Sequence, residues 1–169
     1  FLLAILVIGL GSMGRRRIRV LQSLGEREVY GYDLRSDRVL DCVNDFGLLE
    51  ISSLEQVSQI ADLELVIIST SPGHHVEYIE HFIELEIPVF VEASVTNRIQ
   101  LAAISKSSHF EDGLVFPSIT MLFFDHVLKI MEILPVIGDV FVLSYHVGHH
   151  VEEWHPWERP EEFYVSSPE

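Results

Sequence analysis

The sequence predicts an α/β protein with a doubly wound parallel sheet. A continuous apolar run at residues 3–9 has the composition of a strand covered on both faces, as the strands of parallel sheets are, and residues 64–70 form another strongly apolar strand segment. Segments with helical spacing of apolar residues follow these runs after short connections. A glycine-rich turn joins the first run to the first helical segment. This alternation of strand and helix is typical of a parallel sheet with helices on both faces.

The first elements follow one another at short intervals. The branched apolar run at residues 3–9 predicts a buried strand, and the helix expected at 12–24 is ended by Gly25. A second strand is expected at 28–33. Four further elements are predicted: a short helix at 37–45, a weak strand at 47–51, a helix opened by a serine at 53–60 and a strong apolar strand at 64–70.

The alternation continues as far as Pro117. The elements expected there are a helix at 74–85, a strand at 88–91, a helix at 96–107 and a short strand at 114–116. Beyond Pro117 the pattern changes to a helix at 119–134, a break at Gly138 and an alternating strand at 140–147. We therefore expect a first domain at residues 1–134 and, at residues 135–169, the start of an incomplete second α/β domain.

The composition excludes several classes of protein. The 169 residues carry 11 Lys and Arg against 26 Asp and Glu, a formal charge of −15, which argues against nucleic acid as a partner. Hydrophobic residues make up 48% and charged residues 22%, as in a globular protein. No stretch approaches the roughly 18 apolar residues that a membrane helix needs, and the single cysteine, Cys42, permits no intrachain disulfide. We expect a cytoplasmic protein without a membrane partner.

Gly9, Gly11 and Gly14 form the pattern G-x-G-x-x-G between the first strand and the first helix. In dinucleotide-binding proteins these glycines permit a tight turn, a close approach to a pyrophosphate and close helix–strand packing, and the helix N-terminus adds N–H donors. Asp33 lies 19 residues after Gly14, where a carboxylate binds the ribose hydroxyls. The pattern predicts a dinucleotide-binding domain, and the alternative is an ordinary glycine turn.

Charged residues near this turn bear on which cofactor is bound. Asp33 repels a 2′-phosphate and therefore favours NAD, whereas Arg35 keeps NADP open because a guanidinium binds a phosphate or covers the adenine face. Arg15 and Arg16 occupy the first turn of the helix, where they are placed to assist an anion. For Arg17 and Arg19 we expect a solvated helix face that interacts with acidic neighbours.

Three further segments resemble the glucose–fructose oxidoreductase and inositol dehydrogenase (Gfo/Idh/MocA) family. The segment T-S-P-G-H-H at residues 70–75 resembles the T-P-P-x-x-H turn after the fourth strand of this family. The segment V-F-V-E-A-S at residues 89–94 falls where the family has H-V-F-V-E-K-P. Residues 138–148 resemble the G-x-I-G-x-V entry into its second domain. The resemblance covers nearly the whole chain in the expected order.

This resemblance implies hydride transfer between NAD(P) and a sugar, polyol or nucleotide-sugar carbon. It also implies a C-terminal α/β domain whose open sheet covers the nicotinamide and often mediates homo-oligomerisation. The residues implied to hold the pyrophosphate are Gly9, Gly11, Ser12, Met13 and Gly14, with Asp33 at the ribose. The residues implied to line the cofactor are Thr70, Ser71, Pro72 and His75, with Glu92 near the nicotinamide ribose.

Two departures from the family pattern bear on catalysis. The lysine of E-K-P, which in the family contacts substrate and assists proton transfer, is Ala93 here, and a methyl group neither donates a hydrogen bond nor carries a proton. The G-x-H-x-x-D helix that supplies the usual histidine base comes after this tail in the family and is absent here. His155, in the stretch W-H-P-W, is the candidate for a substrate contact. The chain is expected to bind cofactor without a complete catalytic set, and no metal site is expected.

Two alternatives to this enzyme stay open. Ala93 supports a non-catalytic dinucleotide-binding module, such as a sensor, a regulatory subunit or a pseudo-enzyme. The segment G-L-G-S-M-G also resembles the opening of the β-hydroxyacid dehydrogenases. Those enzymes usually continue into an all-helical second domain, whereas a strand is predicted here from Val140.

Overall fold

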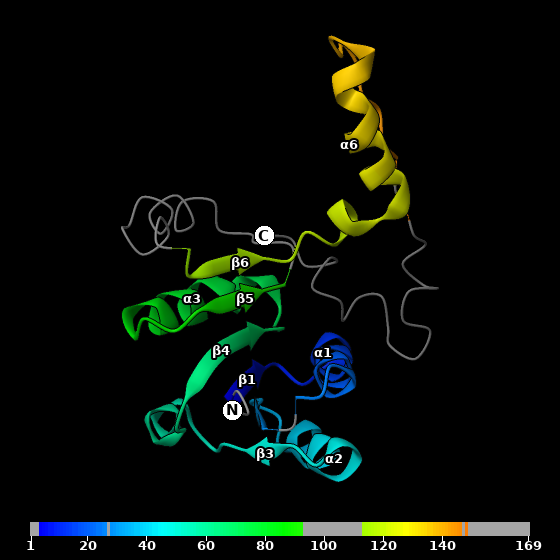
Figure 1. Cartoon of the computed structure of the whole chain (residues 1–169). Coiled ribbons are helices and arrows are strands. Elements are labelled where there is room, and N and C mark those ends of the chain that lie inside the picture. Colours follow the sequence, from blue (N-terminus) through cyan, green and yellow to red (C-terminus); the bar gives the residue numbers. More distant parts are fainter. Residues whose placement is uncertain (1–3, 27, 93–112, 147, 149–169) are drawn as a thin grey trace. The chain divides into compact units, whose positions relative to one another are not determined.

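Parallel strands form one six-stranded sheet in the computed structural model, which describes residues 4–26, 28–92, 113–146 and 148. The strands are β1 (Ala4–Ile8), β2 (Val29–Tyr32), β3 (Leu49–Glu50), β4 (Leu63–Ile68), β5 (Val89–Val91) and β6 (Val115–Pro117). Their order is β3-β2-β1-β4-β5-β6, and every neighbouring pair is parallel (Figure 1). The chain therefore leaves the central β1 first in one direction and then in the other, which confirms the predicted doubly wound sheet.

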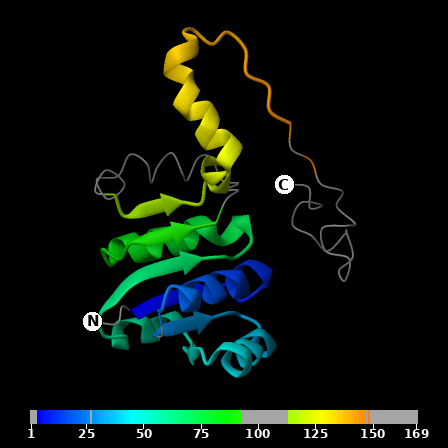
Figure 2. The ribbon, with the colours of Figure 1, turned by 45° about the vertical axis from the view of Figure 1, so that its right-hand side comes forward.

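Helices cover both faces of this sheet (Figure 2). On one face, Ile5 and Val7 of β1 share a core with α1 (Ser12–Ser23) and α2 (Ser36–Phe46). On the other face, Leu6 and Ile8 share a core with the 3₁₀ helix η1 (Leu54–Gln59) and with α3 (His75–Glu84). Alternate side chains of a strand point to opposite faces, so β1 is buried from both sides, as its uninterrupted apolar run predicts.

One predicted helix differs from the structure in its type, and another is confirmed but follows a short 3₁₀ turn. The segment expected as a helix at 53–60 is the 3₁₀ helix η1, which has only six residues before the chain turns into β4. The helix expected at 74–85 begins as a 3₁₀ turn, η2 (Pro72–His74), before α3. Short connections favour 3₁₀ geometry because it closes a turn with fewer residues. The helix predicted at 96–107 lies outside the described residues.

The chain divides into two compact units, Phe1–Ser118 and Ile119–Glu169. The second unit contains η3 (Thr120–Phe123) and α6 (Asp125–Ile137), so the helix predicted at 119–134 begins later and continues through Pro135. Described residues between Gly138 and His146 form no strand, and the strand predicted at 140–147 is wrong there. An alternating apolar pattern becomes a strand only when another strand pairs with it. The domain boundary at residue 134 stays a prediction.

Within the described ranges, the helices are all too short or too polar to cross a bilayer.

The turn between β1 and α1 brings backbone atoms into unusually close contact. A Cβ atom on Gly14 would lie 1.9 Å from the carbonyl oxygen of Gly9. A Cβ atom on Gly9 would lie 2.8 Å from the carbonyl carbon of Ser69, and Gly9 has a φ of +85°, which side chains disfavour. Both positions therefore require glycine for steric reasons within the protein itself.

His75, the first residue of α3, is a buried polar residue with 0% exposure. Its Nε2 lies 2.8 Å from the carbonyl oxygen of Thr70, and its buried Nδ1 has no hydrogen-bond partner among the described residues. Burial lowers the pKa of His75 below its ordinary 6.5, and nearby His74 acts in the same direction. The Thr70 carbonyl and the charge on Glu92 raise this pKa but do not outweigh burial. His75 is therefore held neutral in the folded protein.

Substituting Gly14→Ala should destabilise the sheet unit. The clashing atom belongs to the backbone, so α1 must move relative to β1, and overpacking of this kind costs roughly 1–3 kcal/mol. The midpoint of thermal unfolding should fall by roughly 3–10 °C in a domain of this size. Circular dichroism melting measures this shift, with Gly73→Ala as the control because nothing lies within 4 Å of the added Cβ. Equal melting temperatures for the two variants would contradict the packing.

Lowering the pH should weaken folding through His75. The unfolded chain binds a proton at this residue near pH 6.5, whereas the folded chain binds it only at lower pH, so acidification favours the unfolded state. The stability contributed by neutral His75 is present above pH 6.5 and declines below it, by at most about 1.4 kcal/mol per pH unit.

Urea unfolding of the wild type and of His75→Gln between pH 5 and pH 7.5 tests this dependence. The free energy of unfolding of the wild type should fall more steeply toward acid than that of the variant, because the other histidines are common to both proteins. Identical pH slopes would show that His75 does not titrate with folding.

Candidate functional site

A pocket of about 170 Å³ opens where the carboxyl ends of β1, β2 and β4 meet. The strand order reverses at β1, and the crevice beside such a reversal is where open α/β sheets bind ligands. The residues that line the pocket are Ile8, Gly9, Gly11, Tyr32, Asp33, Leu34, Arg38, Ser69, Thr70, Ser71, His74 and Tyr78. Three segments that are far apart in the sequence therefore contribute to one concave surface.

Helix α1 begins at this pocket with an uncapped N-terminus. Gly11 occupies the N-cap position without a capping side chain, and the first turn contains no acidic residue. Ser12 and Met13, both predicted to hold a pyrophosphate, lie in that turn. The first N–H groups of a helix lack intrahelical partners and carry a partial positive charge of about half an elementary charge. This helix end therefore fits a phosphate group.

Asp33 follows β2 and is held beside the glycine turn by backbone hydrogen bonds. Its Oδ2 accepts the N–H of Leu10 at 2.7 Å, and its Oδ1 accepts the N–H of Arg35 at 2.9 Å. The side chain is 8% exposed. Each carboxylate oxygen accepts more than one hydrogen bond, so both retain capacity for a ligand. A ribose hydroxyl is a suitable donor at this place.

The segment after β4 supplies hydroxyl groups to the same pocket. The N–H of Ser69 donates to the carbonyl oxygen of Ile8 at 2.7 Å, which holds this segment against β1. The buried Oγ of Ser69 and Oγ1 of Thr70 have no hydrogen-bond partner among the described residues. Burying an unpaired polar group costs about 1–3 kcal/mol, so a polar ligand in the pocket would relieve this cost.

The predicted cofactor residues fall into three groups. Those that line the pocket are Gly9, Gly11, Asp33, Thr70 and Ser71. Those that lie next to the lining are Ser12, Met13 and Gly14 in the first turn of α1, together with the buried Pro72 in η2 and the buried His75 at the start of α3. Arg35 and Glu92 are not part of the lining, and His155 lies outside the described residues.

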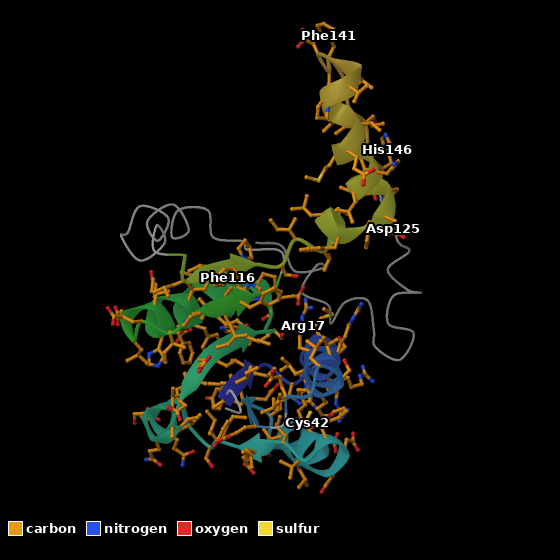
Figure 3. All side chains as sticks on the ribbon, in the orientation of Figure 1. Arg17, Cys42, Phe116, Asp125, Phe141 and His146 are labelled. Carbon is orange, nitrogen blue, oxygen red and sulfur yellow. The ribbon has the colours of Figure 1, made fainter. Side chains whose placement is uncertain are left out.

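Glu92 lies directly after β5 and is paired with Arg17 of α1, the latter labelled in Figure 3. The Nη2 and Nε atoms of Arg17 lie 2.7 and 3.2 Å from Glu92 Oε2, and Nη2 also donates to Ser118 Oγ at 3.1 Å. The same guanidinium lies 5.0 Å from the centre of the Phe90 ring. The expectation for Arg17 is confirmed in its acidic neighbour, Glu92, but is wrong in its solvation, because the two side chains are only 18% and 16% exposed.

Arg15 also differs from its expected role. Its Nη2 lies 3.0 Å from Asp45 Oδ2 and 3.7 Å from Asp41 Oδ2, and its guanidinium lies 5.9 Å from the centre of the Phe46 ring. All three partners belong to α2, so Arg15 links α1 to α2. The adjacent Arg16 is exposed.

Arg38 is a basic side chain that lines the pocket, and its role there is not predicted from the sequence. Its Nη1 lies 3.6 Å from Asp33 Oδ2, and its guanidinium stands beside Gly11. Arg35, the residue predicted from the sequence, binds Asp37 instead, with Nε–Oδ1 and Nη2–Oδ2 distances of 3.1 and 2.5 Å. The available signal was the position of Arg38 in the first turn of the helix after β2.

Aromatic side chains form part of the pocket wall and were also not selected from the sequence. They are Tyr32, His74 and Tyr78. Burial raises the pKa of Tyr78 above its ordinary value of 10, so its hydroxyl is neutral at physiological pH. Aromatic rings beside a carboxylate and hydroxyls fit a ligand that combines a planar base with a ribose.

Solved structures share this fold at low sequence identity. GenD2 from gentamicin A biosynthesis, in complex with NAD, is 18% identical with a TM-score of 0.67, and the match covers 78% of this chain and 38% of GenD2. Myo-inositol 2-dehydrogenase from Lactobacillus plantarum is 17% identical with a TM-score of 0.68, covering 78% and 40% of the two chains. Biliverdin reductase from Synechocystis sp. PCC 6803, with biliverdin and NADP⁺, is 19% identical with a TM-score of 0.67, covering 83% and 45%.

The chain therefore spans less than half the length of each of these proteins. No curated protein sequence matches it.

One family model matches the sequence over most of the sheet unit. It describes an oxidoreductase family with an NAD-binding Rossmann fold, and it matches residues 3–109, which is more than half of the 169 residues. The matched range contains the glycine turn, Asp33 and the segment after β4, from which the pocket is built. The chain belongs to the Gfo/Idh/MocA oxidoreductase family, and its sheet unit is an NAD-binding Rossmann fold.

Proposed function

We propose that this chain carries the cofactor-binding part of an NAD(P)-dependent oxidoreductase. The observation that carries the proposal is the convergence of three polar features on one pocket. These are the uncapped N-terminus of α1, the fixed carboxylate of Asp33 and the unpaired hydroxyls of Ser69 and Thr70. A dinucleotide presents a pyrophosphate and ribose hydroxyls, which these features complement in charge and in hydrogen bonding.

The predicted cofactor residues other than Arg35 each have a proposed role in this complex. Gly9, Gly11, Ser12, Met13 and Gly14 form the pyrophosphate turn. Asp33 accepts hydrogen bonds from the ribose hydroxyls, while Thr70 and Ser71 form part of the pocket wall and the adjacent Pro72 supports them. His75 supports that wall through its hydrogen bond to the Thr70 carbonyl. Glu92, fixed by Arg17, is proposed to lie near the nicotinamide ribose.

The proposed reaction is hydride transfer between the cofactor and a carbon of a sugar, polyol or nucleotide sugar. The nicotinamide supplies the hydride acceptor or donor when the cofactor is bound. Family membership supports this chemistry, and the similarity in fold to a myo-inositol 2-dehydrogenase supports a polyhydroxylated substrate. His155 is proposed to contact that substrate, and the part of the protein beyond the Rossmann unit is proposed to mediate homo-oligomerisation.

A non-catalytic dinucleotide-binding module is the second candidate. It is favoured by Ala93, which stands where the family has a lysine that assists proton transfer, although Ala93 lies outside the described residues. The family match does not support a β-hydroxyacid dehydrogenase. The oxidoreductase and the non-catalytic module share the cofactor site and differ only in whether they catalyse hydride transfer.

NADH should bind to this chain, and Asp33→Ala should weaken binding by roughly 10- to 100-fold, because hydrogen bonds to a charged group contribute about 1.5–3 kcal/mol. Titration of NADH fluorescence measures the affinity. Glu64→Ala removes an exposed carboxylate of β4 with the same change in net charge and should bind like the wild type. Absence of NADH and NADPH binding at millimolar concentration would remove the proposed function.

The full gene product should oxidise a sugar, polyol or nucleotide sugar with NAD⁺ or NADP⁺. Absorbance at 340 nm, followed over a panel of such substrates, measures the reduced cofactor that forms. Asp33→Ala should lower the rate at subsaturating cofactor because binding is weakened. Inactivity across the panel, with cofactor binding intact, would favour the non-catalytic module.

A further inference from the structure

We propose that Arg38 is the specificity-determining residue of the cofactor site and that it enables the site to accept the 2′-phosphate of NADP(H) despite Asp33. The inference rests on the proposed function, because it concerns how the same pocket distinguishes two cofactors. It goes beyond that function by assigning the discrimination to one side chain, and it moves the assignment away from Arg35.

The position of Arg38 is the first reason. Its Nη1 lies 3.6 Å from Asp33 Oδ2 and also 3.6 Å from the place that a Cβ on Gly11 would occupy. The guanidinium therefore stands between the acidic residue after β2 and the second glycine of the pyrophosphate turn. The ribose next to the adenine joins these two points in a dinucleotide bound to a Rossmann fold. Arg38 is thus beside the hydroxyl that carries the extra phosphate in NADP(H).

The hydrogen-bonding state of Arg38 is the second reason. A separation of 3.6 Å from Asp33 is an ion pair but is too long for a hydrogen bond. Within the described part of the chain, the Arg38 side chain makes no hydrogen bond, and it is 38% exposed. Its N–H donors therefore remain available to a ligand in the pocket that Arg38 lines, and a guanidinium binds a phosphate through two parallel hydrogen bonds.

Arg35 is less suitable for this role. Its Nε and Nη2 atoms both bind the carboxylate of Asp37, which neutralises its charge and occupies one edge of its fork. Its side chain is 60% exposed and lies outside the lining of the pocket. A phosphate would have to displace Asp37 to gain the same contact that Arg38 offers directly.

Asp33 does not prevent binding of the phosphate because its charge is already compensated. The N–H groups of Leu10 and Arg35 donate to its two oxygens, and Arg38 stands within ion-pair distance. The ribose of NAD(H) can donate its 2′-hydroxyl to Asp33, whereas the 2′-phosphate of NADP(H) pairs with Arg38. Asp33 therefore serves as the binding partner for NAD(H), and Arg38 serves as the binding partner for NADP(H).

Binding of NADH and NADPH to the wild type, Arg38→Ala and Arg35→Ala tests the inference. The wild type should bind both cofactors. Arg38→Ala should weaken NADPH binding by roughly 10- to 100-fold, since charge-assisted hydrogen bonds contribute about 1.5–3 kcal/mol and each 1.4 kcal/mol is tenfold. Its affinity for NADH should change by less than about threefold. Arg35→Ala, the matched control three residues earlier, should leave both affinities within the same limit.

Shorter probes locate the effect at the ribose. Adenosine 2′,5′-bisphosphate should lose affinity for Arg38→Ala, whereas adenosine 5′-monophosphate should not. The loss should diminish between roughly 50 and 500 mM salt because exposed charges are screened. Arg38→Gln keeps a polar side chain of similar length, so comparing it with Arg38→Ala distinguishes loss of charge from loss of packing. Binding of NADH by each variant shows that the variant is folded.

Equal weakening of NADH and NADPH in Arg38→Ala would overturn the inference, as would a selective loss of NADPH in Arg35→Ala instead. A wild type that binds NADH but rejects NADPH would also overturn it while leaving the proposed function intact. A wild type that binds neither cofactor would contradict the proposed function itself.

Discussion

The site depends on the close backbone contact at the turn between β1 and α1. Gly14 packs on the carbonyl of Gly9, which sets the N-terminus of α1 against the end of β1. Gly9 also packs on Ser69, and its N–H donates to the carbonyl of Tyr32 at 2.9 Å. The ends of β2 and β4 are thereby held next to the helix terminus. Without this contact, the polar groups of three separate segments would not face one pocket.

Charge is distributed unevenly over this framework. The chain is acidic overall, with a formal charge of −15, and several arginines of the sheet unit are bound by carboxylates within it. Arg15 joins the two helices on one face, and Arg17 joins α1 to the end of β5. Arg38 differs because its carboxylate partner, Asp33, is itself part of the pocket. The cationic groups thus stabilise the packing around the crevice, and one of them remains available inside it.

The sequence predicts the sheet well because buried parallel strands require predominantly apolar segments, and β1, β2, β4 and β5 lie where such segments predict them. Gly9, Gly14 and Asp33 are predictable because their roles follow from local sterics and a fixed spacing. The pairing of Arg17 with Glu92 is not, since the partners are 75 residues apart in the chain. The prediction of a strand at 140–147 is wrong among the described residues because the alternating pattern specifies an exposed and a covered face but does not specify a neighbouring strand to pair with.

Hydrogen–deuterium exchange with and without NADH tests the dinucleotide site most directly, because it reports on individual backbone segments. Bound cofactor should slow exchange at residues 9–16, 33–38 and 69–75, which surround the pocket, and leave α6 unchanged. Protection confined to other segments at saturating NADH, with none at the turn between β1 and α1, would contradict the central claim that this pocket holds the cofactor.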